Sequence, residues 1–132
     1  MSRATALVVD DSPDIRTILN YLLSDLGFHI VEAADGHDAV RTARQCQPAL
    51  IFLDLCIPGL DGWEVVERLR SDPALEEVPI IIMTAYYVGS TEQLARRAGC
   101  QRVIPKPLDL FDLTRLVHVL MSPANGLIPL YA

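Results

Sequence analysis

The stretch ATALVVD, residues 4–10, decides the fold. Its apolar residues run continuously instead of alternating with polar ones, which is typical of a strand that is buried on both faces in a parallel sheet. Asp10 ends the run, and Ser12 followed by Pro13 is a good pair for the start of a helix. The stretch therefore predicts a buried strand that leads directly into a helix.

The same unit recurs four more times along the chain. The further apolar runs are FHIVEA (28–33), ALIFLD (49–54), VPIIIMT (78–84) and QRVIP (101–105). Segments with apolar residues at helical spacing lie between them, and their expected capping residues are Ser12, Asp35, Asp61, Ser90 and Asp109. Asp61 with Glu64, and Ser90 with Gln93, have the spacing of a capping box. The pattern predicts an α/β protein of five βα units, (βα)5, with an open, doubly wound parallel sheet, because a closed βα barrel needs eight.

Length and composition point to one domain of ordinary globular composition. The chain has 132 residues and a net charge of −6, which argues against direct nucleic acid binding. Its three cysteines have no metal-binding spacing and are expected to be reduced thiols in the cytoplasm. No signal peptide or apolar run near 20 residues is present, so no membrane association is expected. Residues 1–121 are expected to form the domain and 122–132 a short tail, with no output domain.

Polar side chains stand at the carboxyl end of four predicted strands. Asp10 and Asp11 follow the first strand, Asp54 the third, Thr84 the fourth and Lys106, the only lysine, the fifth. These ends meet at one edge of a parallel sheet. Clustered carboxylates repel each other, and a hard cation such as Mg²⁺ removes that conflict. Asp54 could then act as a nucleophile towards phosphorus, while Lys106 and Thr84 offset charge on the phosphoryl oxygens.

Four segments carry a family resemblance: VVDDS (8–12), LDLCIPGLDGWE (53–64), IIMTA (81–85) and KPLD (106–109). In order and spacing they resemble the signature segments of the receiver domain of two-component response regulators, and the resemblance covers residues 4 to about 121. It implies a flavodoxin-like sheet with strand order 2-1-3-4-5. It also implies a cis peptide bond between Lys106 and Pro107.

The resemblance implies a role for each residue at the predicted edge. Asp54 accepts a phosphoryl group from a phosphohistidine on a sensor histidine kinase or a histidine phosphotransfer protein. Lys106 and Thr84 contact phosphoryl oxygens. The implied ligands of Mg²⁺, or of Mn²⁺, are Asp10 (mainly through water), Asp11, Asp54 and the backbone carbonyl of Cys56. No external substrate is implied, because such a domain catalyses only its own aspartyl phosphorylation and dephosphorylation.

The inward turn of Thr84 is implied to rearrange the face formed by the fourth helix, the fifth strand and the fifth helix. A new dianionic group thereby biases a two-state element that partners recognise. The expected partners are the phosphodonor protein and a downstream effector protein that binds this face, with a homodimer as a further option.

Three positions depart from the family pattern. Val103 stands where the family usually has the aromatic partner of the switch threonine, and a β-branched side chain has few χ1 choices. Either Val103 leaves room for Thr84 to move, or Tyr86 or Tyr87 takes over the readout. Cys56 and Tyr86 flank the path of the hydrolytic water in the family. Cys56 offers no good proton acceptor and Tyr86 is bulky, so slow self-dephosphorylation is hypothesised.

Two other functions compete with the receiver. A phosphatase of the haloacid dehalogenase type also uses an aspartate at a strand end, but it needs a second aspartate two residues later, where Cys56 stands. A pseudo-receiver would keep the fold as an interaction module without phosphorylation. Such modules typically lose the acidic pair, the nucleophile or the lysine, and this chain has all of them.

Overall fold

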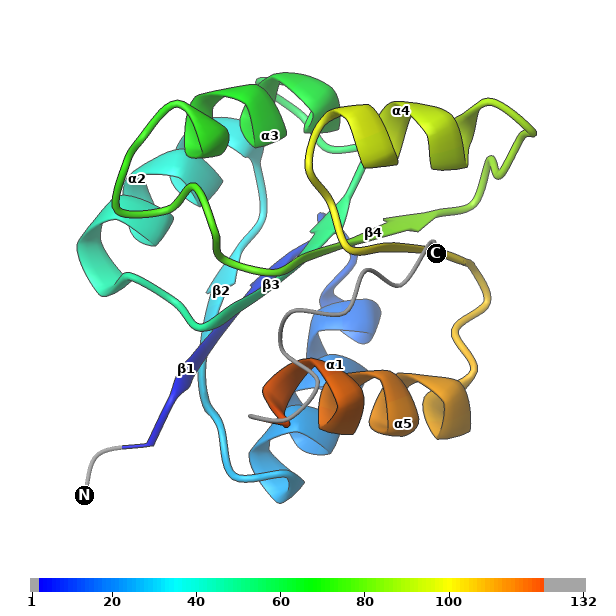
Figure 1. The fold of residues 1–132 in the computed structure, drawn as a ribbon. Helices are drawn as coiled ribbons and strands as arrows, with labels where there is room; N and C mark the ends of the chain where they lie inside the picture. Colours follow the sequence, from blue (N-terminus) through cyan, green and yellow to red (C-terminus); the bar gives the residue numbers. More distant parts are fainter. Residues whose placement is uncertain (1–2, 123–132) are drawn as a thin grey trace.

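The computed structural model describes residues 3–122, and within them five strands alternate with five helices (Figure 1). The strands are β1 (Thr5–Val9), β2 (His29–Ala33), β3 (Leu50–Asp54), β4 (Ile80–Thr84) and β5 (Arg102–Pro105). The helices are α1 (Pro13–Asp25), α2 (Gly36–Cys46), α3 (Gly62–Arg70), α4 (Thr91–Arg97) and α5 (Leu110–Met121). Among residues 3–122, no helix has the length and apolar character needed to cross a membrane. All of the predicted tail except Ser122 lies outside the described residues.

The strands form one parallel sheet in the order β2-β1-β3-β4-β5, which confirms the predicted fold class and strand order. Successive residues of each strand point to opposite faces. Leu7, Ile51 and Ile82 belong to the core beneath α2, α3 and α4, whereas Val8 and Phe52 belong to the core beneath α1 and α5. Both faces are thus covered, and this explains why the strands lack polar alternation.

Four of the five predicted capping residues cap their helices. The side chains of Ser12, Asp35, Asp61 and Asp109 each accept a hydrogen bond from a backbone N–H in the first turn. The capping box predicted at Ser90 is wrong. Its backbone is already helical (φ −81°, ψ −11°) and its side chain makes no capping bond, because a cap needs an extended backbone. Thr91 Oγ1 instead accepts a hydrogen bond from the Val88 N–H, at 3.1 Å.

Two glycines shape the loop that joins β3 to α3. Gly59 has a φ of +84°, a conformation that L side chains rarely adopt. A Cβ atom at Gly62 would lie 2.6 Å from the Cα atom of Leu55, so only glycine lets the start of α3 approach this closely. The Gly62 N–H also donates to the Leu55 carbonyl, at 3.2 Å. The loop therefore holds α3 against the residue that follows Asp54.

The edge strand β5 ends at Pro105, as the sequence predicts. Pro105 pairs in register with Thr84, and the next residue, Lys106, donates its backbone N–H to the Thr84 carbonyl at 2.8 Å. Because N–H groups alternate in direction along a strand, the Pro105 nitrogen points off the sheet, where no hydrogen-bond donor is needed. The Lys106–Pro107 peptide bond is cis, which confirms the expectation from the family resemblance.

The close approach at Gly62 predicts that Gly62→Ala destabilises the protein by about 1–3 kcal/mol, because the added methyl group must displace the Leu55 backbone. Urea unfolding of the purified variant measures this loss. Gly89→Ala is the matched control, since a Cβ atom there meets nothing within 4 Å, and its stability is expected within about 1 kcal/mol of wild type. Equal unfolding midpoints for the two variants would contradict the packing described for this loop.

Candidate functional site

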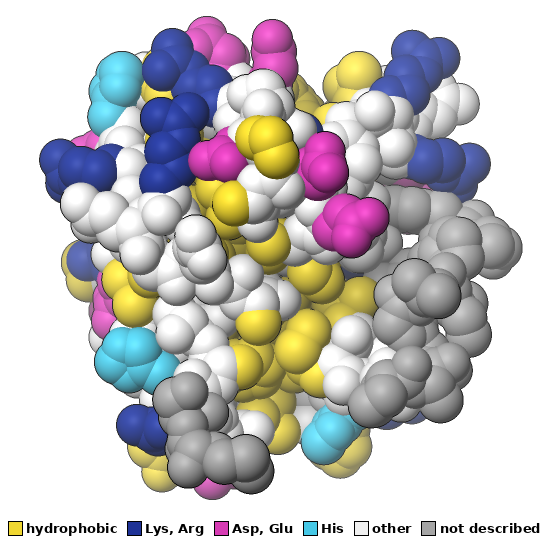
Figure 2. Space-filling model, turned by 60° about the vertical axis from the view of Figure 1, so that its left-hand side comes forward, with side chains coloured by type: hydrophobic (Ala, Val, Ile, Leu, Met, Phe, Trp, Pro, Cys, Tyr) yellow, Lys and Arg dark blue, Asp and Glu magenta, His cyan; other side chains and the backbone are white. Residues whose placement is uncertain are grey.

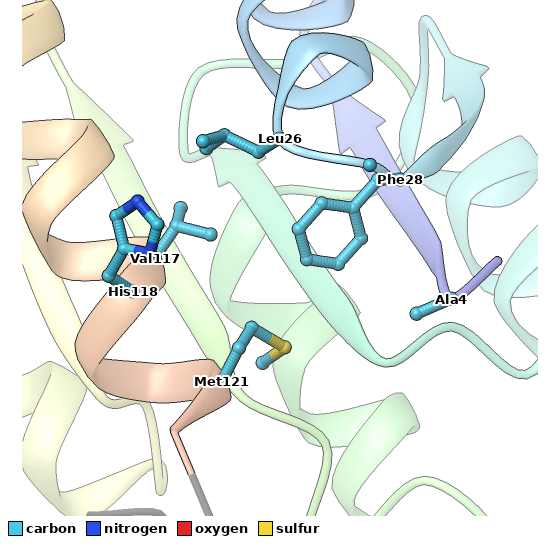
Figure 3. A pocket seen from close by; sticks show the side chains of 7 residues that line it. Ala4, Leu26, Phe28, Val117, His118 and Met121 are labelled. Carbon is cyan, nitrogen blue, oxygen red and sulfur yellow. The ribbon is translucent and has the colours of Figure 1, made fainter.

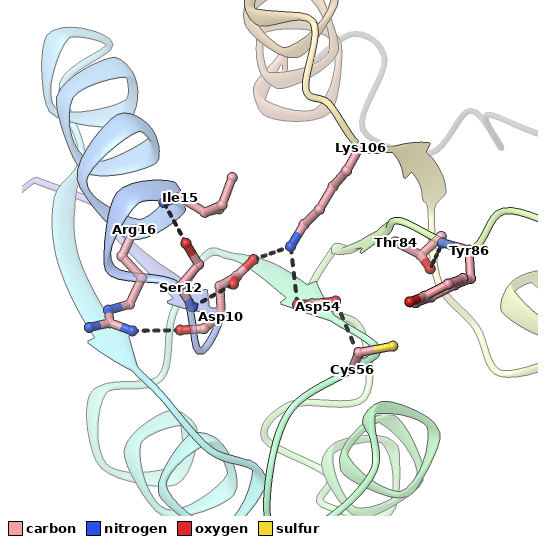
Figure 4. A network of polar contacts seen from close by, with 9 residues as sticks. All are labelled: Asp10, Ser12, Ile15, Arg16, Asp54, Cys56, Thr84, Tyr86 and Lys106. Carbon is pink, nitrogen blue, oxygen red and sulfur yellow. Dashed lines mark hydrogen bonds and ion pairs between the residues drawn. The ribbon is translucent and has the colours of Figure 1, made fainter.

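Three of the predicted site residues meet at the carboxyl edge of the sheet, where Lys106 bridges two buried carboxylates (Figure 4). Asp10 follows β1 and is completely buried, and Asp54 is the last residue of β3 and is 4% exposed. Lys106 Nζ donates to Asp10 Oδ2 at 2.7 Å and to Asp54 Oδ2 at 3.1 Å. The only lysine of the chain is thus directed at the centre of the acidic cluster.

The second oxygen of each carboxylate is held by the backbone. Asp10 Oδ1 accepts a hydrogen bond from the Ser12 N–H at 2.9 Å, and Asp54 Oδ1 accepts one from the Cys56 N–H at 3.1 Å. Each carboxylate is therefore fixed by one ammonium and one backbone donor. The orientation of the Asp54 oxygens is set before any ligand arrives.

Burial and charge act in opposite directions on these groups. Burial raises the pKa of Asp54, and the nearby Asp10 charge adds to the rise, while the hydrogen bonds from Cys56 and Lys106 oppose it. For Lys106, burial alone would lower the pKa, but its hydrogen bonds to the two aspartates outweigh burial and raise it. The ammonium therefore stays charged, whereas ionised Asp54 is costly without further positive charge.

A third carboxylate, that of Asp11, completes the cluster. One carboxylate oxygen from each of Asp10, Asp11 and Asp54 lies within 4.8 Å of the others. The Asp11 side chain is exposed, and no hydrogen bond or ion pair from residues 3–122 engages it. Three carboxylates around one ammonium leave negative charge that a hard divalent cation neutralises. The donor set therefore fits Mg²⁺, which prefers one or two carboxylates with water for the rest of its shell.

Thr84 lies next to this cluster but its hydroxyl is engaged elsewhere. The residue ends β4 and is 1% exposed, and its Oγ1 accepts a hydrogen bond from the Tyr86 N–H at 3.0 Å. Its backbone carbonyl accepts from the Lys106 N–H. Thr84 is thus connected by hydrogen bonds both to the lysine segment and to the loop that leads into α4.

The three departures from the family pattern have different surroundings. Val103 is 4% exposed and packs in the core beneath α2, α3 and α4. Tyr86 is 74% exposed, and the Cys56 thiol is exposed and unpaired. Interaction with the Glu92 side chain of α4 is the main reason that the Tyr87 pKa is raised. The loop after Thr84 is therefore linked to α4 through Tyr87.

One residue that contacts the site, Arg16, was not predicted from the sequence. Its guanidinium donates to the Asp10 backbone carbonyl at 2.7 Å and forms an ion pair with Glu32 at 3.0 Å. A signal was present in the sequence, because Arg16 stands near the start of a predicted helix. A positive charge there is opposed by the helix macrodipole, which suggests a specific partner.

A separate apolar pocket of about 320 Å³ lies at the opposite end of β1, beside Ala4 (Figure 3). Leu26, Phe28, Val117 and Met121 line it, and His118 is the only titratable side chain of residues 3–122 that does so. Figure 2 shows a band of apolar side chains along the middle of one face of the molecule. No carboxylate from the described part of the chain lines this pocket, which is distinct from the Asp54 site.

The chain matches the response regulator receiver domain over residues 6–118 and belongs to that family. It is a receiver domain of two-component signalling. It is similar to an uncharacterized 14.6 kDa protein of Leptolyngbya boryana, with 35% identity over 118 residues that cover 89% of this chain and 90% of the relative.

Two solved structures share the fold. Chemotaxis protein CheY4 of Vibrio cholerae has a TM-score of 0.82 and 27% identity, covering 89% of this chain and 98% of that one. The receiver domain of sensor histidine kinase PA1611 from Pseudomonas aeruginosa has a TM-score of 0.79 and 29% identity, covering 89% and 96%. That second structure has a magnesium ion coordinated in its active-site cleft.

The raised pKa of Asp54 predicts how stability depends on pH in the metal-free protein. A carboxyl group whose pKa is higher in the folded state than in the unfolded state binds more protons in the native protein. Its contribution to the free energy of unfolding therefore falls as the pH rises from the unfolded pKa to the folded pKa. Asp54→Asn is therefore expected to be more stable than wild type at pH 7, and the difference should shrink as the pH falls towards the unfolded value near about 4. Thermal unfolding in EDTA across this range measures it. A variant less stable than wild type at pH 7 would contradict the assignment.

Proposed function

We propose that this receiver domain is controlled by phosphorylation, with Asp54 as the acceptor and a phosphohistidine of a sensor histidine kinase or histidine phosphotransfer protein as the donor. One observation carries the proposal. The Asp54 carboxylate is buried at the sheet edge, held by Lys106 at 3.1 Å and by the Cys56 N–H, with two further carboxylates within 4.8 Å.

The residues of the site have different proposed roles in phosphoryl transfer. An Asp54 oxygen forms the new O–P bond while the P–N bond of the phosphohistidine breaks, and the imidazole keeps the electron pair of that bond. Lys106 and the Cys56 N–H orient the attacking carboxylate, and the Lys106 ammonium offsets the charge that arrives. The residues that would hold Mg²⁺, or Mn²⁺, are Asp10, Asp11, Asp54 and the Cys56 carbonyl. The cation supplies positive charge that screens the carboxylates from the phosphoryl oxygens.

The contacts of Thr84 support a route from the phosphoryl group to a partner surface. If the Thr84 hydroxyl turns to bind a phosphoryl oxygen, it gives up its bond from the Tyr86 N–H. The loop containing Tyr87 is then free to shift, and the Tyr87 side chain interacts with Glu92 on α4. The proposed readout is therefore carried by Tyr86 and Tyr87, since Val103 is packed in the core.

The face formed by α4, β5 and α5 is the proposed surface for an effector protein or for a second copy of the chain. A groove of about 290 Å³ on this face is lined by Arg102 of β5 and by the α5 residues Asp112, Arg115, Leu116 and Val119. The mixed charge of the groove and the exposed Val119 side chain suit a protein partner. We further propose a cytoplasmic location and a domain spanning residues 1–121 with a tail at 122–132.

The pseudo-receiver remains the second candidate, and Val103, Cys56 and Tyr86 are the residues that favour it. Against it, Asp10, Asp54 and Lys106 form one hydrogen-bonded cluster with Asp11 beside it. A phosphatase of the haloacid dehalogenase type needs a carboxylic acid two residues after the nucleophilic aspartate. Cys56 stands at that position, and a thiol is a poor proton donor to oxygen at neutral pH.

Incubation with acetyl phosphate and Mg²⁺ is predicted to add one phosphoryl group to the protein, as measured by intact mass. Asp54→Asn should abolish the addition because it removes the nucleophile, and EDTA should abolish it in wild type. Lys106→Arg is expected to impair the transmission of phosphorylation to the α4–β5–α5 face, because a planar guanidinium does not replace a compact ammonium. Well-folded wild-type protein that gains no mass over hours would favour the pseudo-receiver.

The lifetime of the phosphorylated protein is a separate prediction. Cys56 offers no base to position the hydrolytic water and Tyr86 adds bulk, so the phosphoryl group is expected to persist for minutes or longer. Tyr86→Ala should shorten this lifetime, whereas Tyr21→Ala, which removes another exposed tyrosine on α1, should not. The decay of the phosphorylated mass after removal of acetyl phosphate measures both. A wild-type half-life of seconds that Tyr86→Ala leaves unchanged would refute the hypothesis.

A further inference from the structure

The peptide unit between Asp10 and Asp11 joins a fixed carboxylate to one that has no hydrogen-bond or ion-pair partner among residues 3–122. The Asp10 N–H donates to the Ala33 carbonyl at 3.1 Å, and the Asp10 side chain is held by Ser12 and Lys106. The Asp11 carboxylate makes no hydrogen bond or ion pair with residues 3–122, although it lies within 4.8 Å of the other two. The position of Asp11 is therefore set mainly by its backbone.

Arg16 is the residue that holds this backbone. Its NH1 group donates to the Asp10 carbonyl at 2.7 Å (Figure 4). Its Nε donates to Glu32 Oε1 at 3.0 Å. The Asp10 carbonyl and the Asp11 nitrogen belong to the same planar peptide, so a bond to one orients the other. The guanidinium is a rigid fork, and it ties this peptide to the end of β2.

Further hydrogen bonds hold the Glu32 carboxylate that pairs with Arg16. The other oxygen of Glu32 accepts a hydrogen bond from Asn20 Nδ2 at 3.1 Å, and Asn20 Oδ1 accepts one from Ser24 at 3.1 Å. Arg16, Asn20 and Ser24 follow one another at four-residue spacing along α1. The Arg16 side chain is only 20% exposed, unlike a typical surface ion pair of small effect.

We infer that Arg16 is a positioning residue of the metal site: with Glu32 and Asn20 it fixes the Asp10–Asp11 peptide and so sets the Asp11 carboxylate for cation binding. This inference rests on the proposed function, because it concerns the same cation. It explains why a positive charge is retained where the macrodipole of α1 opposes it. The role is indirect, since the guanidinium donates to the Asp10 backbone carbonyl and to Glu32 and not to the Asp11 or Asp54 carboxylate.

The sign of the expected effect separates positioning from plain electrostatics. Removing a positive charge close to a cation site should, by Coulomb's law alone, strengthen cation binding. Arg16→Met keeps the apolar stem but removes the donors. If Arg16 positions Asp11, this variant must instead bind the cation more weakly, by about 10-fold or more, as is usual when a group that orients a ligand is lost.

The test measures Mn²⁺ affinity by electron paramagnetic resonance and the Asp11 amide resonance by NMR in the metal-free protein. Arg16→Met is expected to weaken Mn²⁺ binding and shift the Asp11 amide, and Arg16→Lys should restore part of both. Arg44→Met is the matched control. Arg44 is an α2 arginine whose ion pair, to Asp72 at 3.7 Å, lies outside the site, so neither readout should change.

Each outcome decides between the proposals. If wild type binds no Mn²⁺, the proposed function fails. If wild type binds but Arg16→Met binds equally well or better, the proposed function stands and the positioning role is refuted. An equal loss in Arg44→Met would also refute it. If Arg16→Met fails to fold, Glu32→Gln is the second variant, because it weakens the ion pair that holds Arg16. Glu32→Gln is expected to lose less Mn²⁺ affinity than Arg16→Met. An unchanged Mn²⁺ affinity in Glu32→Gln would overturn the inference.

Discussion

The Lys106 ammonium, shared between the Asp10 and Asp54 carboxylates, is the interaction on which the site depends. These three residues stand at the ends of β1, β3 and β5, and β4 separates β5 from β3 in the sheet. One side chain from the edge strand thus reaches the centre of the sheet. Without it, two buried carboxylates would face each other with only single backbone donors, which is a costly arrangement in a low-dielectric interior.

The burial of Asp54 beside Asp10 costs the free protein stability. Asp54 is ionised in a buried place where its charge is only partly compensated, and its raised pKa records that cost. A divalent cation brings the missing positive charge, so binding it should relieve a conflict present in the free protein. We propose Thr84 as a bistable element, because its hydroxyl accepts from the Tyr86 N–H in this structure and would have an alternative partner in the proposed phosphorylated state.

The strands, most of the helix caps and the location of the site could be predicted from the sequence, because they depend on local patterns. Continuous apolar runs identified the buried strands, and the acidic residues and Lys106 at their ends identified the edge. The cap predicted at Ser90 was wrong because the spacing from Ser90 to Gln93 does not determine the backbone angles of Ser90, which are helical. Arg16 was missed because its partner is a backbone carbonyl and because Glu32 is on another element, neither of which a single sequence displays.

The ionisation of Asp54 tests the central claim most directly. The claim is that Lys106 holds a buried carboxylate whose charged form is disfavoured by burial and becomes more favourable when a cation binds. A ¹³C NMR titration of the Asp54 carboxyl carbon, without and with Mg²⁺, follows this group alone. The account predicts a pKa above that of an unperturbed aspartate in EDTA and a clear fall when Mg²⁺ is added. A carboxyl that titrates at or below the ordinary value in EDTA, and does not respond to Mg²⁺, would contradict it.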